Sequence, residues 1–569
     1  MDRNLFLAFA LSFLVLTTWT LWQSKQRADD FPEGKSEAPI VQVAPGAAET
    51  PPETVADSRV SESIPHGSEP VSKSPPSAMV AARTVAVSTP FYTAELSTRG
   101  GGLSRWTLEQ FRDASLPEHP KVELTTLEAD EIALATPFHE LGLGDLSQAD
   151  FQVEQPSPYD VVFMHQERGV SIRKAYTFGQ DSYDFRLELR IDNGSQETLS
   201  PIFELGWPVR ERSTQDFADH ALLVLADGSV QRVPLAQLGT TSFFSRFLGG
   251  TPSTGPIVHP GEIDWAGAET RYFVSVFLPG VPREAQARFE IVEPGKAGAA
   301  ALSFHPATIP PGQSFQREYR GYLGPKQSDR LAAAGPSLER TINRGWNWVS
   351  PLTAAFSWML RAAYSVIPNY GVAIILITVL VRLGMAPLMT KQMRSMRRLG
   401  ELQPRMKEIQ ERNADDRQRQ SEEMMKLYRQ SGVNPLGGCF PMLLQFPVFI
   451  GLYYALQSSI DLRQAPFLLW IRDLSAPESL FTIPGLGIPA RVLPLLMGAS
   501  MVLQSKLTPT SVDPAQARMM MTVMPVMFTV LFYRFPSGLV LYWFVSNLLG
   551  IGQQLWVNRG LAKAPAPAK

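Results

Sequence analysis

Gly371–Leu388 reads GVAIILITVLVRLGMAPL and is apolar for long enough to span a membrane, yet it contains Arg382. A charged side chain at membrane depth costs at least about 2.5–3.5 kcal/mol, so it normally faces protein or a water-filled cavity and marks function. Thr378 lies one helical turn before Arg382 and shares its face. The stretch therefore predicts a transmembrane helix with one polar stripe, and any function must explain a lone cation inside the membrane.

The rest of the chain divides into two halves of different character. Its 569 residues are too many for one ordinary domain. The first half is polar, whereas long apolar runs dominate the second. The formal net charge of −2 gives no reason to expect a nucleic-acid partner. The single cysteine, Cys439, excludes an intrachain disulfide.

The amino-terminal region predicts a membrane anchor followed by a linker. Leu5–Trp22 is about long enough to cross a bilayer. A cleaved signal peptide is the alternative, but threonines and tryptophans stand where such a peptide needs small residues, so residues 1–23 are predicted to remain as an anchor. Residues 24–82 are rich in Pro, Ala, Ser and Glu and almost lack aromatic residues, which predicts a disordered linker.

Residues 83–325 alternate apolar and polar side chains with period two, as in Tyr183–Ile191 (YDFRLELRI) and, over a longer run, Val85–Leu96. Glycine-containing turn signals separate these segments. Many strands without helical periodicity between them favour a β-sandwich. Its histidines are dispersed without metal-ligand spacing, and its acidic residues form no visible pair, so a catalytically silent surface is expected.

Two helical patterns follow the β region. Residues 337–367 contain an amphipathic helix, Pro351–Ile367, predicted to lie on the membrane surface, with an ordinary packed helix as the alternative. Residues 391–430 are the most charged stretch, with a break at Asn413-Ala414 that predicts a helical hairpin. Short loops rich in Lys and Arg stay in the cytoplasm, which places the β region outside and the amino terminus inside.

Four further apolar runs follow the hairpin. Phe440–Leu456 is predicted to be broken by Pro441 and Pro447, and an external loop covers residues 461–490. The later runs are 492–503, 519–533 and 539–557. Together with the earlier spans they predict about six transmembrane helices with both termini in the cytoplasm.

Three roles for Arg382 follow from composition. Its side chain could snorkel to the inner headgroups. It could line the path of a transporter or channel, although the sequence shows neither repeated halves nor an intramembrane carboxylate to carry protons. It could belong to a groove that accepts other membrane segments, with methionines and aromatic residues adapting to varied partners. Composition alone does not choose between them.

Sequence motifs favour the third of these roles, a groove that accepts other membrane segments. The stretches NPLGGCFP (434–441), LRQAPF (462–467) and FPSGLVLYW (535–543), with Arg382, closely resemble the YidC family of bacterial membrane protein insertases. The resemblance implies an insertase core at 368–560 with five spans, an extra first span, a large periplasmic β-supersandwich and a cytoplasmic tail at 561–569. It also implies a chaperone that moves and folds newly made inner-membrane proteins, alone or with the Sec translocon.

The resemblance further implies partners and site residues. The expected partners are nascent inner-membrane proteins, Sec translocon subunits, the ribosome and the bilayer, in the bacterial inner membrane. No catalytic residue, metal or cofactor is expected, and no GxxxxGK[ST] phosphate loop occurs. The implied groove residues are Arg382, Thr378, Gln445, Gly538, Ser546 and Gln554. The implied hydrophobic slide comprises Cys439, Phe440, Phe446, Pro447, Phe532, Tyr542 and Trp543.

Two positions depart from the family pattern, and one other class of function remains. Gly550 stands where a threonine often lines the groove, and Arg534 stands where an apolar or aromatic residue is expected. Because the family's β fold resembles galactose mutarotase-like domains, the alternative function is a membrane-anchored periplasmic carbohydrate-binding or sugar-modifying protein.

Overall fold

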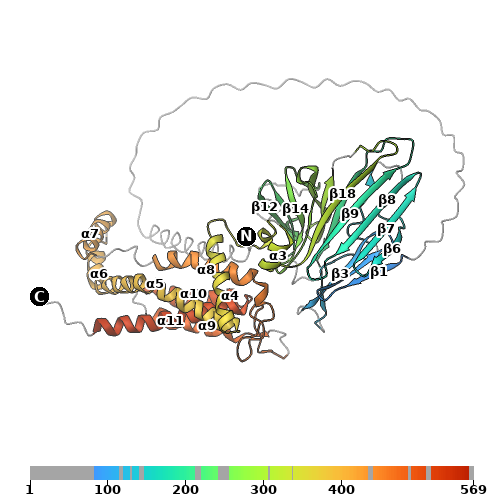
Figure 1. Ribbon diagram of the computed structural model, residues 1–569. Coiled ribbons are helices and arrows are strands. Elements are labelled where there is room, and N and C mark those ends of the chain that lie inside the picture. Colours follow the sequence, from blue (N-terminus) through green and yellow to red (C-terminus); the bar gives the residue numbers. More distant parts are fainter. Residues whose placement is uncertain are drawn as a thin grey trace, which may run out of the picture. The chain divides into compact units, whose positions relative to one another are not determined.

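The computed structural model describes residues 82–113, 119–128, 131–136, 138–139, 146–211, 220–240, 255–304, 308–335, 337–414, 416–432, 440–484, 489–507 and 514–562 (Figure 1). The predicted anchor at 1–23, almost all of the predicted linker at 24–82 and the tail after residue 562 lie outside the described residues.

The first part of the described chain is built on one nine-stranded antiparallel sheet. Across the sheet its strands are β12 (Ser229–Pro234), β11 (Ala221–Ala226), β14 (Ile263–Glu269), β15 (Phe273–Leu278), β18 (Ser314–Pro325), β9 (Asp184–Asn193), β8 (Val170–Phe178), β7 (Asp160–Glu167) and β6 (Gln152–Ser157).

Two smaller antiparallel sheets accompany it. The five-stranded sheet consists of β13 (Ile257–His259), β16 (Ala285–Glu293), β17 (Ala297–Phe304), β10 (Ile202–Arg210) and β5 (Phe138–His139). The four-stranded sheet consists of β1 (Thr84–Ser88), β2 (Tyr92–Ser97), β3 (Gly102–Arg112) and β4 (Lys121–Glu123).

Both smaller sheets cover the same face of the large one. Phe178 and Phe185 lie opposite each other on β8 and β9, and their ring centroids lie 6.2 and 6.1 Å from that of Trp106 in the four-stranded sheet. Trp207 of the five-stranded sheet lies 5.4 Å from Phe277 on β15. Because Phe277 also approaches Phe185, at 6.4 Å, one core joins all three sheets. The β-sandwich that the alternating pattern predicted is therefore confirmed.

Two details of this region differ from the sequence prediction. Val85–Leu96 is not one strand, because Thr89 accepts the backbone N–H groups of Phe91 and Tyr92 in a tight turn that separates β1 from β2. Lys174 occupies an inward position of β8 and is fully buried. Its ammonium donates to the carbonyl oxygens of Gly100, at 3.0 Å, and Leu134, at 2.7 Å, so it joins two turns to the sheet.

The second part of the described chain is helical. Its elements are α3 (Ser328–Ala334), η3 (Leu338–Thr341), α4 (Ser350–Val366), α5 (Tyr370–Glu401), α6 (Gln403–Arg412), α7 (Arg417–Gln430), α8 (Phe440–Ser458), η5 (Ile460–Leu462), α9 (Val492–Leu507), α10 (Pro514–Phe532) and α11 (Ser537–Ala562), with a short hairpin of β19 (Phe481–Thr482) and β20 (Pro489–Ala490) before α9. α11 packs between α5 and α9, α10 packs on α9, and α4 contacts α5 and α8 (Figure 1).

The helix boundaries agree with several sequence predictions and correct two. α4 matches the predicted amphipathic helix, and the break between α6 and α7 falls at the predicted Asn413-Ala414. However, α8 continues through Pro447, since one missing N–H does not break a helix that its neighbours support. α5 also runs on into the charged segment as far as Glu401, where Leu399 packs with Met406 and Leu427 of the hairpin.

The number of spans is not confirmed. Within the described residues, α5 is the one helix whose own length and composition suffice to cross a membrane. α9 and the segment Met521–Phe532 are shorter apolar helices.

Candidate functional site

Arg382 is positioned by α5. The helix begins after Asn369, whose side-chain oxygen accepts the backbone N–H of Val372 at 3.1 Å and so caps it. One turn before Arg382, the fully buried Thr378 donates its hydroxyl to the carbonyl of Ile374 at 2.6 Å. The opposite face carries exposed Leu380 and Leu383, so α5 has the single polar stripe that its sequence predicts.

The guanidinium of Arg382 reaches α11. Its Nε donates to the hydroxyl of Ser546 at 2.9 Å, and Gly550 lies one turn further along the same face of α11. A Cβ atom at Gly550 would lie 3.6 and 3.7 Å from the two terminal guanidinium nitrogens and 3.0 Å from Nε2 of Gln504 on α9. Glycine at this position therefore provides the space in which the cation lies.

More polar groups continue along the contact between α9 and α11. The amide of Asn547 donates to the hydroxyl of Ser500 at 2.9 Å, and Ser500 in turn donates to the carbonyl of Met497 at 2.6 Å. Arg382, Thr378, Ser500, Gln504, Ser546, Asn547 and Gly550 are called the polar seam below. Sequence reasoning missed Ser500 and Gln504, because an isolated polar residue in an apolar run gives no sign of which helix it will face.

Among the residues that the structure describes, no nearby acid neutralises the charge of Arg382. Within the described residues no carboxylate forms an ion pair with it, and the hydrogen bond it makes there is the one to Ser546. A guanidinium has five N–H donors, so most of its donor capacity is left for other groups. Arg382 as a whole residue is half-buried rather than fully enclosed.

The other predicted groove residues are distributed over three places. Gln445 on α8 donates to the hydroxyl of Tyr542 on α11 at 2.6 Å. Tyr542 lies one turn before Ser546, so this pair extends the polar seam toward α8. Gln554 is buried but bonds to Asn558 of its own helix at 3.3 Å. Gly538 lies two turns before Ser546, against the loop between α8 and α9.

That loop closes one end of the helical bundle. The backbone N–H groups of Ser537 and Gly538 donate to the carbonyls of Ala476 and Leu474, each at 2.9 Å. The hydroxyl of Ser537 also donates to the carbonyl of Asp473 at 2.7 Å. The first N–H groups of α11, which have no partner inside the helix, are therefore satisfied by the loop, and a Cβ at position 538 would meet it at 3.0 Å.

The predicted hydrophobic slide is partly visible. Cys439 and the side chain of Phe440 lie outside the described residues, whereas Phe446 and Pro447 are half-buried on α8. Trp543 of α11 lies 5.1 Å from Phe532 and 5.8 Å from Phe528 of α10, and 4.9 Å from Phe449 of α8. These four rings form an aromatic cluster where three helices meet, and Tyr542 on the same helix turns instead toward Gln445.

Comparisons with known proteins identify the family. The family model described as 60Kd inner membrane protein matches residues 362–564, and the model of the YidC periplasmic domain matches residues 84–359. The membrane protein insertase YidC of Pelobacter propionicus is 34% identical over 98% of this chain and 99% of its own length. The chain belongs to the YidC family of membrane protein insertases. The YidC of Methylobacillus flagellatus, at 32% identity over 100% of this chain and 99% of its own, agrees.

Family membership gives the location of the parts. YidC-family proteins lie in the inner membrane, and residues 84–359 of this chain correspond to the family's periplasmic domain. Two solved structures resemble the chain only weakly. The chain aligns with an active YidC insertase with a TM-score of 0.35 and 17% sequence identity, and the alignment covers 82% of this chain and 91% of the insertase chain. The chain aligns with a GalM/aldose epimerase homologue from C. elegans with a TM-score of 0.30 and 13% sequence identity, and the alignment covers 43% of this chain and 99% of the homologue. The assignment to the family does not depend on these two scores.

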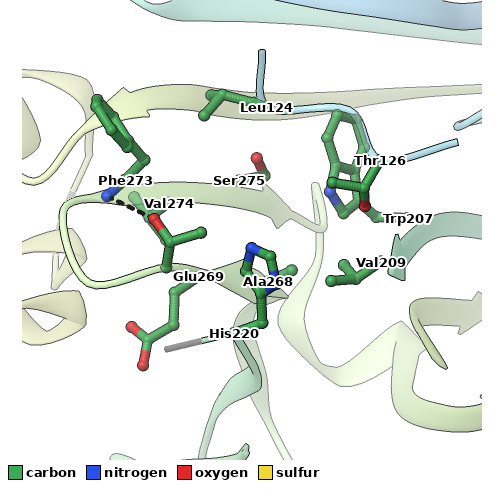
Figure 2. Close-up of a pocket in the computed structure, with 11 residues that line it drawn as sticks. Leu124, Thr126, Trp207, Val209, His220, Ala268, Glu269, Phe273, Val274 and Ser275 are labelled. Carbon is green, nitrogen blue, oxygen red and sulfur yellow. Dashed lines mark hydrogen bonds between the residues drawn. The ribbon is translucent and has the colours of Figure 1, made fainter. Parts of the chain in front are cut away.

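The periplasmic domain contains a small cavity between its sheets. It measures about 30 Å³, and Figure 2 shows His220, Glu269 and Ser275 among the residues that line it. This volume suits about one water molecule and is far below the several hundred Å³ of a typical small-molecule site. A second hollow of about 380 Å³ includes Glu318 and Arg320, and Arg320 already donates to the carbonyl of Ala334 at 2.6 Å. The cavity between the sheets is too small to favour the sugar-modifying alternative.

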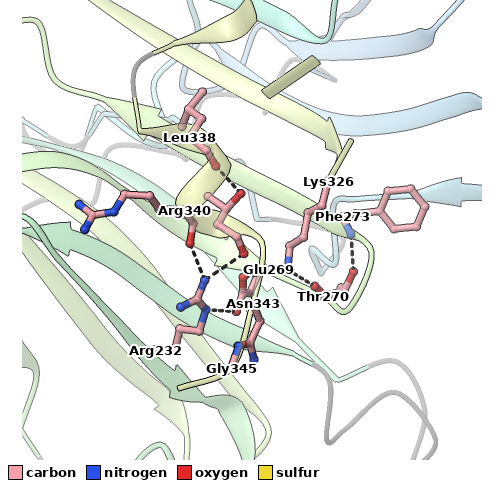
Figure 3. Close-up of polar contacts among 10 residues, drawn as sticks. Arg232, Glu269, Thr270, Phe273, Lys326, Leu338, Arg340, Asn343 and Gly345 are labelled. Carbon is pink, nitrogen blue, oxygen red and sulfur yellow. Dashed lines mark hydrogen bonds and ion pairs between the residues drawn. The ribbon is translucent and has the colours of Figure 1, made fainter. Parts of the chain in front are cut away.

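A buried ionic network lies where the periplasmic domain ends. Glu269 on β14 accepts from Lys326 at 2.8 Å with one oxygen and from Arg232 at 3.0 Å with the other. Arg232 also donates to the carbonyls of Arg340 and Thr341 at 2.8 and 2.9 Å (Figure 3). The network therefore ties β12, β14 and the end of β18 to η3, the element that precedes α4.

Proposed function

We propose that the polar seam is the wall of a hydrophilic groove, open toward the cytoplasm and the lipid, that receives polar stretches of nascent membrane proteins. The observation that carries this proposal is a half-buried cation held by a hydroxyl group, with no carboxylate ion pair among the described residues. A structural cation in a low-dielectric layer is normally paired, since an unpaired one costs several kcal/mol.

The chemistry of the step is electrostatic and needs no nucleotide. An acidic tail loses its hydration when it enters the membrane, and the guanidinium of Arg382 offers a positive charge and free N–H donors in return. Thr378, Ser500, Ser546 and Asn547 are buried, so they make this wall polar without facing the groove water directly. The hydrophobic segments of the substrate then partition into lipid, which supplies the driving force.

Two surfaces would guide the substrate on either side of this wall. The aromatic cluster around Trp543, with Phe446 on α8, is proposed as the slide along which apolar segments leave, because large rings adapt to varied apolar partners. The loop that satisfies the first N–H groups of α11 is proposed to close the groove on the periplasmic side. The charged hairpin of α6 and α7 would cover the cytoplasmic entrance.

The proposal includes the topology and the partners implied by the family. Six spans would place both termini in the cytoplasm. α4 would lie on the periplasmic surface of the inner membrane. The first span at 1–23, the linker at 24–82, the core at 368–560 and the tail at 561–569 are the proposed boundaries. Sec translocon subunits and the ribosome are the proposed protein partners, besides the nascent chain.

The test compares variants of Arg382 in insertion assays with full-length protein in proteoliposomes. Arg382→Ala is expected to reduce insertion of a substrate with an acidic tail by roughly tenfold, which is about 1.4 kcal/mol, and to change a neutral-tailed version little. Arg382→Lys keeps the charge and retains more activity. Arg397→Ala, which removes a cation further along α5, is the matched control and is expected to have less than about a twofold effect.

Equal insertion of both substrates by wild type and Arg382→Ala would contradict the electrostatic role. A separate experiment places a photoreactive residue at Phe446 or Trp543. Crosslinks to the apolar segment of a nascent chain are expected at both, and their absence would contradict the proposed slide.

A further inference from the structure

The loop between α8 and α9 carries an exposed apolar tip. Phe467 and Ile471 close a tight turn, in which the N–H of Phe467 donates to the carbonyl of Ile471 at 3.0 Å. Between them, Leu468 and Leu469 are 58% and 88% exposed. Phe467, Trp470 and Ile471 are at least partly buried, whereas Leu468 and Leu469 face away from the protein.

The backbone does not favour leucine at the tip. Leu469 has a φ of +56°, the left-handed region in which a Cβ atom is crowded and which glycine or asparagine adopts at lower cost. A buried side chain can offset such strain through packing, but Leu469 has almost none. Neither the turn geometry nor the protein core therefore accounts for an apolar residue at this position.

The tip lies beside the outer end of a membrane span. The side-chain amide of Asn369, which caps α5, donates to the carbonyl of Phe467 at 3.4 Å. The ring of Phe467 covers Gly371, where an added Cβ atom would lie 2.0 Å from the ring. In the topology proposed above, on which this inference rests, the start of α5 lies at the periplasmic surface of the membrane, because the match to the periplasmic domain ends at residue 359, shortly before α5.

Two neighbouring features suit a membrane surface. At the start of α5, Tyr364 stacks on Tyr370 with ring centroids 4.0 Å apart, and Val366, two residues after Tyr364, is 80% exposed. Arg472 follows the tip, is exposed, and has no ion pair among the described residues. A cation beside exposed apolar side chains is typical of segments that lie in a headgroup layer.

We propose that Leu468 and Leu469 insert into the outer leaflet of the inner membrane and anchor the α8–α9 loop there. The acyl chains surround the two leucines, and Arg472 binds the phosphate group of a phospholipid. Because the same loop satisfies the first N–H groups of α11, the anchor also holds the outer ends of α5 and α11 at the depth of the membrane surface.

Lipid quenching of a fluorescent label tests this proposal. Full-length Cys439→Ser protein receives a single Leu469→Cys substitution and an environment-sensitive label. It is reconstituted in phosphatidylethanolamine–phosphatidylglycerol vesicles with or without brominated acyl chains. Val258→Cys, at an apolar residue of β13 that is 46% exposed, is the matched control in the periplasmic domain. Quenching by brominated lipid is expected to be several-fold stronger at position 469 than at position 258. Quenching by aqueous iodide is expected to be stronger at position 258 than at position 469.

A second variant separates the anchor from the fold of the loop. Leu469→Gly removes the apolar side chain and relieves the left-handed backbone, so it should leave thermal unfolding in detergent unchanged or raise its midpoint. A label at Leu468→Cys in this background is expected to lose at least half of its quenching by brominated lipid. Equal lipid quenching at 469 and 258 would overturn the proposal. So would a label at 469 shielded from both lipid and iodide, because that result indicates a protein partner.

Discussion

Lys326 in the periplasmic domain and Arg382 in the helical part are both cations removed from bulk water, but their surroundings differ. The Lys326 side chain is 4% exposed and lies 2.8 Å from a carboxylate oxygen of Glu269, which also pairs with Arg232 (Figure 3). Arg382 meets the neutral hydroxyl of Ser546. The paired cation stabilises the fold. In the function proposed above, Arg382, which has no ion pair among the described residues, keeps its charge available to a substrate.

The largest effect is expected from removing the carboxylate of Glu269, which pairs with Lys326. Glu269→Ala leaves Lys326 and Arg232 without their shared anion, and breaking a buried pair in this way destabilises a protein by about 3–5 kcal/mol. Hydrogen exchange of full-length protein should show faster exchange in β12, β14 and β18. Glu318→Ala, in an exposed pair with Arg186 at 3.9 Å, is the control and should change stability by under about 1 kcal/mol. An equal loss of stability in Glu269→Ala and Glu318→Ala would contradict the conclusion that burial makes the Glu269 ion pairs important for stability.

The second test uses Lys174, a buried cation of the periplasmic domain that pairs with no carboxylate among the described residues. Burial holds the pKa of Lys174 well below its ordinary value, and its ammonium is bonded to two carbonyls. Lys174→Met should cost about 1–3 kcal/mol near neutral pH, because two buried acceptors lose their donor. Exchange protection of β8 reports the change.

The same lysine gives a pH dependence with a defined sign. Between the lowered pKa in the folded state and about 10.4 in the unfolded state, the unfolded chain binds more protons, so stability rises with pH. In Lys174→Met this rise should disappear. The measurement is best made between about pH 7 and 9, below the range in which unfolded-state tyrosines ionise. A wild-type slope that persists in the variant would exclude Lys174 as its source.

The third test fills the space beside the unpaired cation. Gly550→Leu would crowd Gln504 and the guanidinium of Arg382, whereas Gly550→Ala needs a shift of only a few tenths of an ångström in a flexible amide. Insertion of an acidic-tailed substrate should fall about three- to tenfold in the leucine variant and stay near wild type in the alanine variant. Gly552, around which a Cβ would meet nothing within 4 Å, supplies the control as Gly552→Leu.

The smallest effect is expected where α11 holds the second half of α5. Gln553 donates to the carbonyl of Ala386 and the hydroxyl of Thr390, both at 3.0 Å, on either side of Pro387. Gln553→Ala should loosen residues 388–401 by about 0.5–1.5 kcal/mol, seen as faster hydrogen exchange. Gln554→Ala removes a bond within α11 alone and should leave α5 unchanged. Faster exchange of α5 in both variants would exclude a specific link through Gln553.

Local signals in the sequence account for much of the architecture. Period-two alternation in β9 and the amphipathic pattern of α4 follow from which face is buried, so both were predictable. Lys174 was not, because a lysine in an alternating strand is ordinarily assigned to the surface, and its acceptors, Gly100 and Leu134, are 74 and 40 residues away. The spacing of local residues carries no information about such distant partners.

The candidate site shows the same division. Arg382 was conspicuous in the sequence because a charge in an apolar run is costly wherever the run lies in a membrane. Gly550 looked like a departure from the family pattern, and its position beside the guanidinium became clear only when α11 was placed against α5. Ser500 and Gln504 on α9 likewise gave no sign of their role in the primary structure.

The sequence by itself determined the family, the β-sandwich, the principal apolar helix and the presence of a cation within it, because hydrophobic periodicity and local motifs are written along one continuous stretch of chain. Only the tertiary structure decided which groups meet that cation and which apolar residues remain uncovered. Hydrogen-bond partners and exposure depend on how helices far apart in the chain pack together, and no local pattern encodes that packing.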